Sequence, residues 1–84
     1  MFYEYVDDML ERRGPHRDGH LALVRSWKDD GRIAMAGALG SPPHGAVIVF
    51  DVDEPAEIEE FTGADPYVAA GLVTSRRVEP LALV

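Results

Sequence analysis

The feature that most limits the fold of this chain is the alternation of extended and helical patterns along its 84 residues. Stretches rich in β-branched and other apolar residues are typical of strands, and apolar residues at helical spacing are typical of helices. The expected strands span residues 2–6, 33–39, 46–52 and 73–84, with Pro80 interrupting the last one. The expected helices span residues 15–30 and 54–61, and a further helical turn is expected at residues 66–70.

The long helix has clear boundaries in the sequence. Pro15 suits the first turn of a helix, and Gly31 is a residue type that commonly ends one. Leu21, Val24 and Trp27 recur at helical spacing, so they form an apolar face. A helix with one such face is expected to pack against a sheet.

The resulting order, β-α-β-β-α-β, is the split βαβ or ferredoxin-like plan. The predicted fold class is therefore α+β, with an antiparallel four-stranded sheet and both helices on one face. The other face would be uncovered, and we expect it to carry the apolar side chains of Met1, Tyr3, Tyr5, Met35, Val47 and Val49. An exposed apolar face of that size implies a partner. A second copy, packed sheet to sheet, would form a dimeric α/β barrel, so a homodimer is expected.

Length and charge narrow the class of protein. A chain of 84 residues fits one domain, residues 1–84, whose core is small enough to favour self-association. The chain has no cysteine, which excludes disulfides and fits a reducing compartment, so we expect a cytoplasmic protein. The net charge of −7 disfavours nucleic acid and anionic membranes as partners. No apolar run is long enough to span a bilayer, and the N-terminus does not have the pattern of a signal peptide.

His20 is the first candidate for a chemical role. His20, Leu23, Val24 and Trp27 fall at helical spacing, so the imidazole borders the apolar face of the long helix. Arg17, three residues earlier, projects to the same side. A histidine and an arginine near a helix N-terminus suit an anion or enolate, and a partly buried imidazole can move protons near neutral pH. The alternative is a half-buried histidine with satisfied hydrogen bonds and a surface arginine.

Asp65 is the second candidate. It stands directly before Pro66, at the N-cap position of the expected turn, where its carboxylate can accept a bond from a backbone amide. It could also reach His20 and hold the imidazole in one tautomer, as carboxylates do in catalytic pairs. The two roles are compatible, since a carboxylate has two oxygens.

The other polar residues give weaker signals. His16 and His44 are more typical of the surface than of a ligand set, and no third ligand accompanies His16 and His20. Residues 37–40 lack the lysine and the following helix of a phosphate-binding loop. We therefore expect no metal ion and no cofactor.

Several short motifs follow one another along the chain. They are Arg17-x-x-His20-Leu21, Asp30-Gly31-Arg32, Ala36-Gly37-Ala38-Leu39, Asp65-Pro66-Tyr67-Val68-x-Ala70-Gly71-Leu72, and Glu79-Pro80 in the last segment. In this order and spacing the sequence resembles the YCII-related family over nearly its whole length. The resemblance implies a ferredoxin-like domain that forms a dimeric α/β barrel.

The resemblance also implies site residues. A histidine–aspartate pair in a cleft maps onto His20 and Asp65, and an arginine maps onto Arg17. Known chemistry in the family includes dehydrochlorination of chlorinated hydroxyquinols. Related dimeric barrels carry out lyase, isomerase and monooxygenase chemistry on small compounds, which is an analogy at the level of the fold.

Two hypotheses follow. In the first, the chain is a small cofactor-independent enzyme of lyase, dehydrochlorinase or isomerase type that acts on a small aromatic or keto/enol compound. His20 would be the general acid/base, Asp65 would hold it, and Arg17, Trp27 and Met35 would bind the substrate. In the second, the chain is a non-catalytic module for small-ligand binding or assembly, and the pair is structural. A subunit that works only with a larger enzyme is a third possibility.

Overall fold

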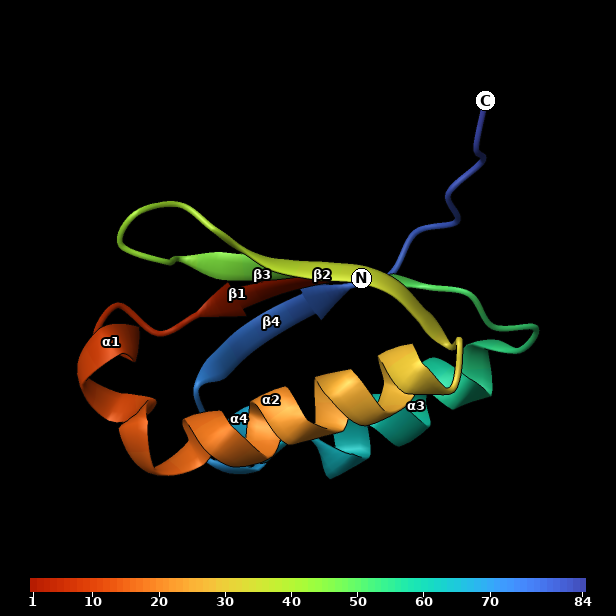
Figure 1. Cartoon of the computed structure of the whole chain (residues 1–84). Helices are drawn as coiled ribbons and strands as arrows, with labels where there is room; N and C mark the ends of the chain where they lie inside the picture. The colour runs from red at the N-terminus through yellow and green to blue at the C-terminus, as the bar shows by residue number, and fades with distance from the viewer.

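One antiparallel sheet forms the upper layer of the molecule (Figure 1). The computed structural model describes residues 1–84. The strands are β1 (Phe2–Tyr5), β2 (Ile33–Leu39), β3 (Gly45–Phe50) and β4 (Val73–Arg77), in the spatial order β2-β3-β1-β4. Both pairings of β1 and the pairing of β2 with β3 are antiparallel, which is the predicted ferredoxin-like arrangement.

The helices are α1 (Met9–Arg12), α2 (Gly14–Asp29), α3 (Pro55–Ala64) and α4 (Pro66–Ala69). Helices α2, α3 and α4 lie on one face of the sheet (Figure 1). Local signals explain their ends. Helix α3 begins with a capping box between Glu54 and Glu57, and α4 begins at Asp65, whose side chain accepts from the Tyr67 amide. Gly31 follows α2 with a φ of 78°, a conformation that favours glycine. No helix is long and apolar enough to cross a membrane.

The main core lies between the sheet and α2 and α3. Trp27, Phe50 and Phe61 pack edge to face, with ring centroids 5.3 to 5.9 Å apart. Each such pair contributes about 0.5–1.5 kcal/mol beyond the burial of its surface. Ile33 and Ile48 complete this part of the core from the sheet side. The aromatic cluster fixes α2 and α3 against the sheet, and so fixes the helix that carries His20.

The structure corrects the prediction for the first strand. Met1, Tyr3 and Tyr5 were expected on the uncovered face, but Met1 and Tyr3 are buried in the main core and Tyr5 packs against it from the helix side. In the register of the sheet, Tyr3 lies opposite Ala46, whose small side chain leaves room for the ring. Strand alternation alone does not say which face is covered, and a slip of one residue exchanges the two faces.

Met35, Val47 and Val49 lie on the face away from the helices, as predicted. Met35 and Val49 are paired across β2 and β3, and Val47 pairs with Phe2 across β3 and β1. Met35 is 60% exposed, and neither valine belongs to a core cluster. The uncovered face is therefore apolar near its centre, although it carries fewer large side chains than expected.

The last strand is shorter than predicted. It ends at Arg77, which pairs with Phe2, the first residue of β1. No strand lies beside residues 78–84, and Pro80 has no N–H to donate to a ladder. These residues form an extended tail that leaves the body on the side of the sheet opposite the helices (Figure 1). Strand β3 likewise ends at Phe50 rather than at residue 52.

Candidate active site

Two buried side chains from different parts of the chain meet beside the sheet. Nδ1 of His20, on α2, lies 2.8 Å from Oδ1 of Asp65, at the start of α4. The side chain of His20 is 10% exposed and that of Asp65 is fully buried. The structure therefore places the histidine and the carboxylate within hydrogen-bond distance.

Asp65 accepts three hydrogen bonds. The hydroxyl of Tyr3 donates to Oδ2 at 2.8 Å, while the backbone N–H of Tyr67 and Nδ1 of His20 reach Oδ1 at 3.0 and 2.8 Å. A carboxylate stripped of water needs such donors, because burial without partners costs several kcal/mol. One side chain thus caps α4 and holds the imidazole, so the two roles considered for it occur together.

The hydrogen bonds also define the state of the imidazole. A carboxylate only accepts, so Nδ1 of His20 carries the hydrogen and donates it to Asp65. In a neutral ring Nε2 then carries the lone pair. Nε2 has no hydrogen-bond partner. Every buried side-chain nitrogen and oxygen atom of the chain has a partner, so Nε2 is not buried and is open to solvent. The geometry leaves a proton acceptor at the surface of the site.

All three tyrosines of the chain surround this pair. The ring of Tyr67 stacks on His20 with centroids 3.9 Å apart and an angle of 10° between the planes. Tyr5 contacts Tyr67 edge to face at 6.0 Å and lies 6.4 Å from Tyr3. Burial raises the pKa of each of these tyrosines above its ordinary value, and the negative charge of Asp65 adds to the rise. The hydroxyls therefore stay protonated at neutral pH.

A glycine allows α2 to approach α4 this closely. A Cβ atom built on Gly19 would lie 3.1 Å from Cγ of Pro66, tighter than an ordinary contact. Gly19 precedes His20, and Pro66 follows Asp65. The absence of a side chain at Gly19 thus permits the short distance between the imidazole and the carboxylate.

A small cavity of about 210 Å³ opens beside His20, between α2 and the sheet. Typical pockets for drug-sized ligands hold about 300–1,000 Å³, so this one suits a smaller compound. Most of its wall is apolar, and several sheet residues in it have small side chains. The lining residues are Tyr5, Arg13, Arg17, His20, Leu21, Val24, Ala36, Gly37, Ala38, Ala46, Ile48 and Tyr67.

Two arginines lie at this cavity without a carboxylate partner. Neither Arg13 nor Arg17 forms an ion pair within 4.0 Å, whereas four other arginines of the chain do. The chain has 15 acidic residues for 8 basic ones, so acceptors for them are plentiful. Burial raises the pKa of Tyr67, and the positive charges of these two guanidinium groups oppose that rise. With the N-terminus of α2 nearby, the cavity mouth is electropositive.

The structure does not bring Trp27 or Met35 to this cavity. Trp27 lies in the core, with the guanidinium of Arg32 3.7 Å above its ring, and Met35 projects from the opposite face of the sheet. His16 lies one turn before His20 but does not line the cavity, and His44 lies at a different hollow. No group of three or more His, Cys, Asp or Glu side chains comes together in the structure.

Sequence reasoning missed Tyr3 as a donor to Asp65, Tyr67 as the stacking partner of His20, and Arg13 at the cavity mouth. Tyr67 is part of the Asp-Pro-Tyr motif, and the position of this tyrosine two residues after the carboxylate was a usable signal. Tyr3 and Arg13 had no such signal, because they reach the site only through the register of β1 and the turn between α1 and α2.

Known proteins include relatives of this chain. Residues 1–82 match the family model described as the YCII-related domain. The chain belongs to the YCII-related family. The resemblance noted in the sequence is thereby confirmed for nearly the whole length of the chain.

Relatives of this YCII-related chain include Protein YciI of Escherichia coli O6:H1 and Protein YciI of Shigella flexneri. Each is 29% identical over 82 residues, covering 87% of this chain and 84% of the relative. Among solved structures, 5-chloro-2-hydroxyhydroquinone dehydrochlorinase from Burkholderia phenoliruptrix AC1100, in complex with 2,5-dihydroxybenzoquinone, is similar with a TM-score of 0.81. The likeness covers 96% of this chain and 89% of that one at 20% identity, and it shows that the two share a fold.

Proposed function

We propose that this YCII-related protein is a cofactor-independent acid/base enzyme that acts on a small anionic ring compound or a keto/enol compound. One observation carries the proposal. The imidazole of His20, held by a fully buried carboxylate, has a free Nε2 at a cavity that also holds two arginines without ion pairs. An acceptor for a proton and cations for a developing negative charge are the two requirements of enolate or phenolate chemistry.

Each residue has a distinct part in the proposed reaction. Nε2 of His20 takes a proton from a hydroxyl or an activated carbon of the substrate, and Asp65 stabilises the imidazolium that forms. Arg13 and Arg17 bind the oxygen that becomes negative. The stacked ring of Tyr67 holds the imidazole plane in place. The proton later returns to the product, or passes to water when the leaving group departs as chloride, so the cycle needs no oxidant or reductant.

The similar dehydrochlorinase suggests a substrate class. Dehydrochlorination removes a proton and a chloride ion from one molecule, and a base such as Nε2 supplies the first half of that reaction. Its ligand, 2,5-dihydroxybenzoquinone, is a single ring with acidic hydroxyls, which is the size and charge that a cavity of about 210 Å³ with two arginines suits. We therefore propose small hydroxylated rings as substrates, with or without chlorine.

The test uses the two compounds named for that relative as probes. Binding of 2,5-dihydroxybenzoquinone is measured by thermal shift, and turnover of 5-chloro-2-hydroxyhydroquinone is measured as chloride release. His20→Gln keeps an N–H for Asp65 but cannot take up a proton, so turnover should fall by about 100-fold or more. His16→Gln is the matched control on the same helix, outside the cavity, and should retain full turnover. Equal turnover in both variants would exclude the role of His20, and no binding of either compound would exclude the substrate class.

A second function has its own support. Asp65 is fully buried with every oxygen satisfied, as in a purely structural pair, and such a pair suits a non-catalytic module that only binds a small ligand. The same variant separates the two functions. In an enzyme, His20→Gln lowers turnover by about 100-fold or more and leaves binding of the ring compound within a few-fold of wild type. In a binding module, no turnover exists to lose, and only binding and stability change.

We also propose that the protein works as a homodimer that packs through its uncovered sheet face. Support comes from the apolar centre of that face and from the small size of the chain. Sedimentation equilibrium of the intact chain tests this. A single domain over residues 1–84 and a cytoplasmic location stay predictions, the latter from the lack of cysteine.

A further inference from the structure

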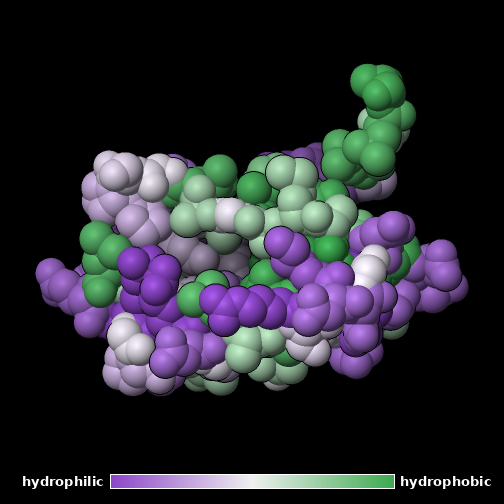
Figure 2. All heavy atoms as spheres, in the orientation of Figure 1, coloured by the Kyte–Doolittle hydropathy of each residue, from purple (hydrophilic) through white to green (hydrophobic).

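The last residues of the chain form an apolar tail that contacts little of its own body. Leu81 and Leu83 expose 62% and 87% of their surface, and Val78 and Val84 are exposed as well. Figure 2 shows this tail as a hydrophobic projection from a body whose lower half is mainly hydrophilic. Four large apolar side chains within seven exposed residues are uncommon on a protein surface, and they indicate a contact that one chain does not supply.

The start of the tail has a defined direction. Arg77, the last residue of β4, pairs with Glu79 and lies 4.6 Å above the ring of Phe2. Beyond this point the chain rises away from the helices, on the side of the uncovered sheet face (Figure 1). Pro80 prevents the tail from continuing as a regular strand, so its contacts are made by side chains.

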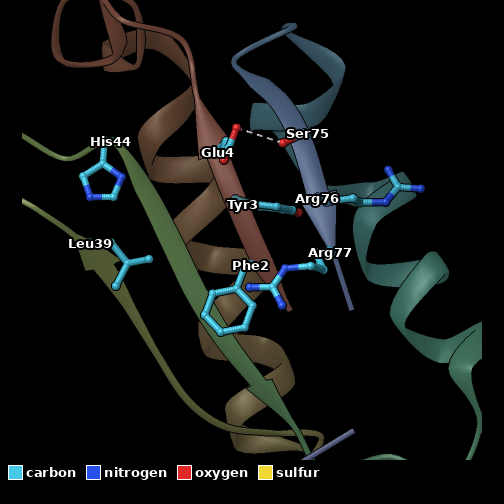
Figure 3. Close-up of a pocket in the computed structure, with 8 residues that line it drawn as sticks. All are labelled: Phe2, Tyr3, Glu4, Leu39, His44, Ser75, Arg76 and Arg77. Carbon is cyan, nitrogen blue, oxygen red and sulfur yellow. Dashed lines mark hydrogen bonds between the residues drawn. The ribbon is translucent and has the colours of Figure 1, made fainter. Parts of the chain in front are cut away.

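The uncovered face carries a hollow of mixed polarity. The hollow has a volume of about 300 Å³ and is seen in Figure 3 with α2 behind the strands. Among the side chains that line it are Phe2, Glu4, Leu39, His44, Ser75 and Arg77. Three of its eight lining residues are hydrophobic, and the other five, Arg76 among them, are polar or charged. Glu4 and Ser75 are joined by a hydrogen bond of 3.1 Å, so the acidic group is partly satisfied. The apolar surface continues across the face through Val47 and Val49.

We propose that residues 78–84 cross to a second copy of this chain and pack in the hollow on the uncovered sheet face of that copy. This inference rests on the homodimer proposed above. It assigns the tail a function as an arm that joins the two copies. Each copy would then donate one arm and receive one, as a two-fold axis requires.

Two observations favour a second copy over another protein. The arm and the hollow lie on the same side of one chain, so a copy stacked on that side brings its own hollow beside the arm. Seven extended residues span about 23 Å, which is comparable with the molecule's dimensions of 36 by 23 by 18 Å.

The first experiment removes the arm. A chain ending at Arg77 keeps every residue of the sheet, the core and the site, so its far-UV circular dichroism should match that of the full chain. Its dimer dissociation constant, measured by sedimentation equilibrium, should rise by at least about tenfold because two buried leucines are lost. An unchanged dissociation constant would overturn the arm and leave the homodimer intact. A full chain that is monomeric at all concentrations tested would overturn both the arm and the proposed homodimer.

The second experiment uses the absence of cysteine in the chain. Leu83→Cys in one chain is mixed with Ser75→Cys in a second chain of different mass, and a short bismaleimide is added. A cross-linked heterodimer is expected, because the proposed contact brings the thiol at position 83 of one chain close to the thiol at position 75 of the other. The control replaces Ser75→Cys with Ala22→Cys on the exposed side of α2. Equal cross-linking in both mixtures, or none in either, would overturn the proposal.

Discussion

Replacing Tyr3 with phenylalanine tests the hydrogen bonds that hold the site. Tyr3→Phe removes one hydroxyl and leaves the ring in the core, so the packing between β1 and the helices is preserved. The hydroxyl is the only donor to Oδ2 of Asp65, and the Asp65 side chain is fully buried. The variant therefore leaves a buried carboxylate oxygen without a partner, while Oδ1 keeps its two donors.

The expected cost follows from that geometry. A hydrogen bond to a charged group contributes about 1.5–3 kcal/mol, and an unsatisfied buried acceptor adds its own desolvation penalty. We expect the free energy of unfolding to fall by about 2–3 kcal/mol. For a domain of this size each kcal/mol corresponds to about 4–8 °C in the melting temperature. The free energy of unfolding of a small domain is about 0.05–0.15 kcal/mol per residue. The expected loss is therefore a large part of the total stability.

Urea denaturation followed by the fluorescence of Trp27, the single tryptophan, measures this loss. Protomer concentration is kept constant, because self-association adds to apparent stability. Tyr5→Phe is the matched control: it lies two residues along the same strand, and its hydroxyl makes no hydrogen bond within the chain. Its cost should be below about 0.5 kcal/mol. Equal losses in the two variants would refute the argument that the hydroxyl of Tyr3 satisfies Asp65.

Three further predictions concern other parts of the molecule. Gly45→Ala should destabilise the fold by more than about 2 kcal/mol in urea denaturation, because the new Cβ would lie 2.3 Å from the carbonyl oxygen of Tyr3; Gly63→Ala, with open space around it, should be neutral or stabilising. The melting temperature should fall as the pH rises above about 10. Above that pH the unfolded chain releases its tyrosine protons, whereas the folded chain retains them because its tyrosine pKa values are raised. Below that pH the tyrosines are protonated in both states, so the melting temperature does not depend on them. Ionisation of about half of the tyrosines in the folded protein at pH 10, as expected for unperturbed phenols and seen by absorbance, would contradict this. Arg17→Gln should weaken binding of 2,5-dihydroxybenzoquinone by about tenfold in calorimetry, whereas Arg25→Gln on the same helix should not, and equal affinities would remove the arginine from the anion site.

Much of the candidate site was accessible from the sequence. The position of His20 on an apolar helix face and the N-cap position of Asp65 are local properties, and the structure shows both. Their meeting across 45 residues was implied by the family resemblance and not by spacing. The side chains that line the cavity were harder to predict: Trp27 and Met35 lie elsewhere, because a residue on an apolar helix face or in a strand can face the core or the other side of the sheet.

By itself, the sequence determined the order of the strands and of the helices α2, α3 and α4, the ends of α2 and the cap of α4. These features depend on contacts within a few residues, which propensity and capping describe well. Only the tertiary structure decided which face of β1 is buried, where β4 ends, and that Arg13 stands free at the cavity. Strand alternation is symmetric between the two faces of a sheet, so the choice is made by the packing of distant segments.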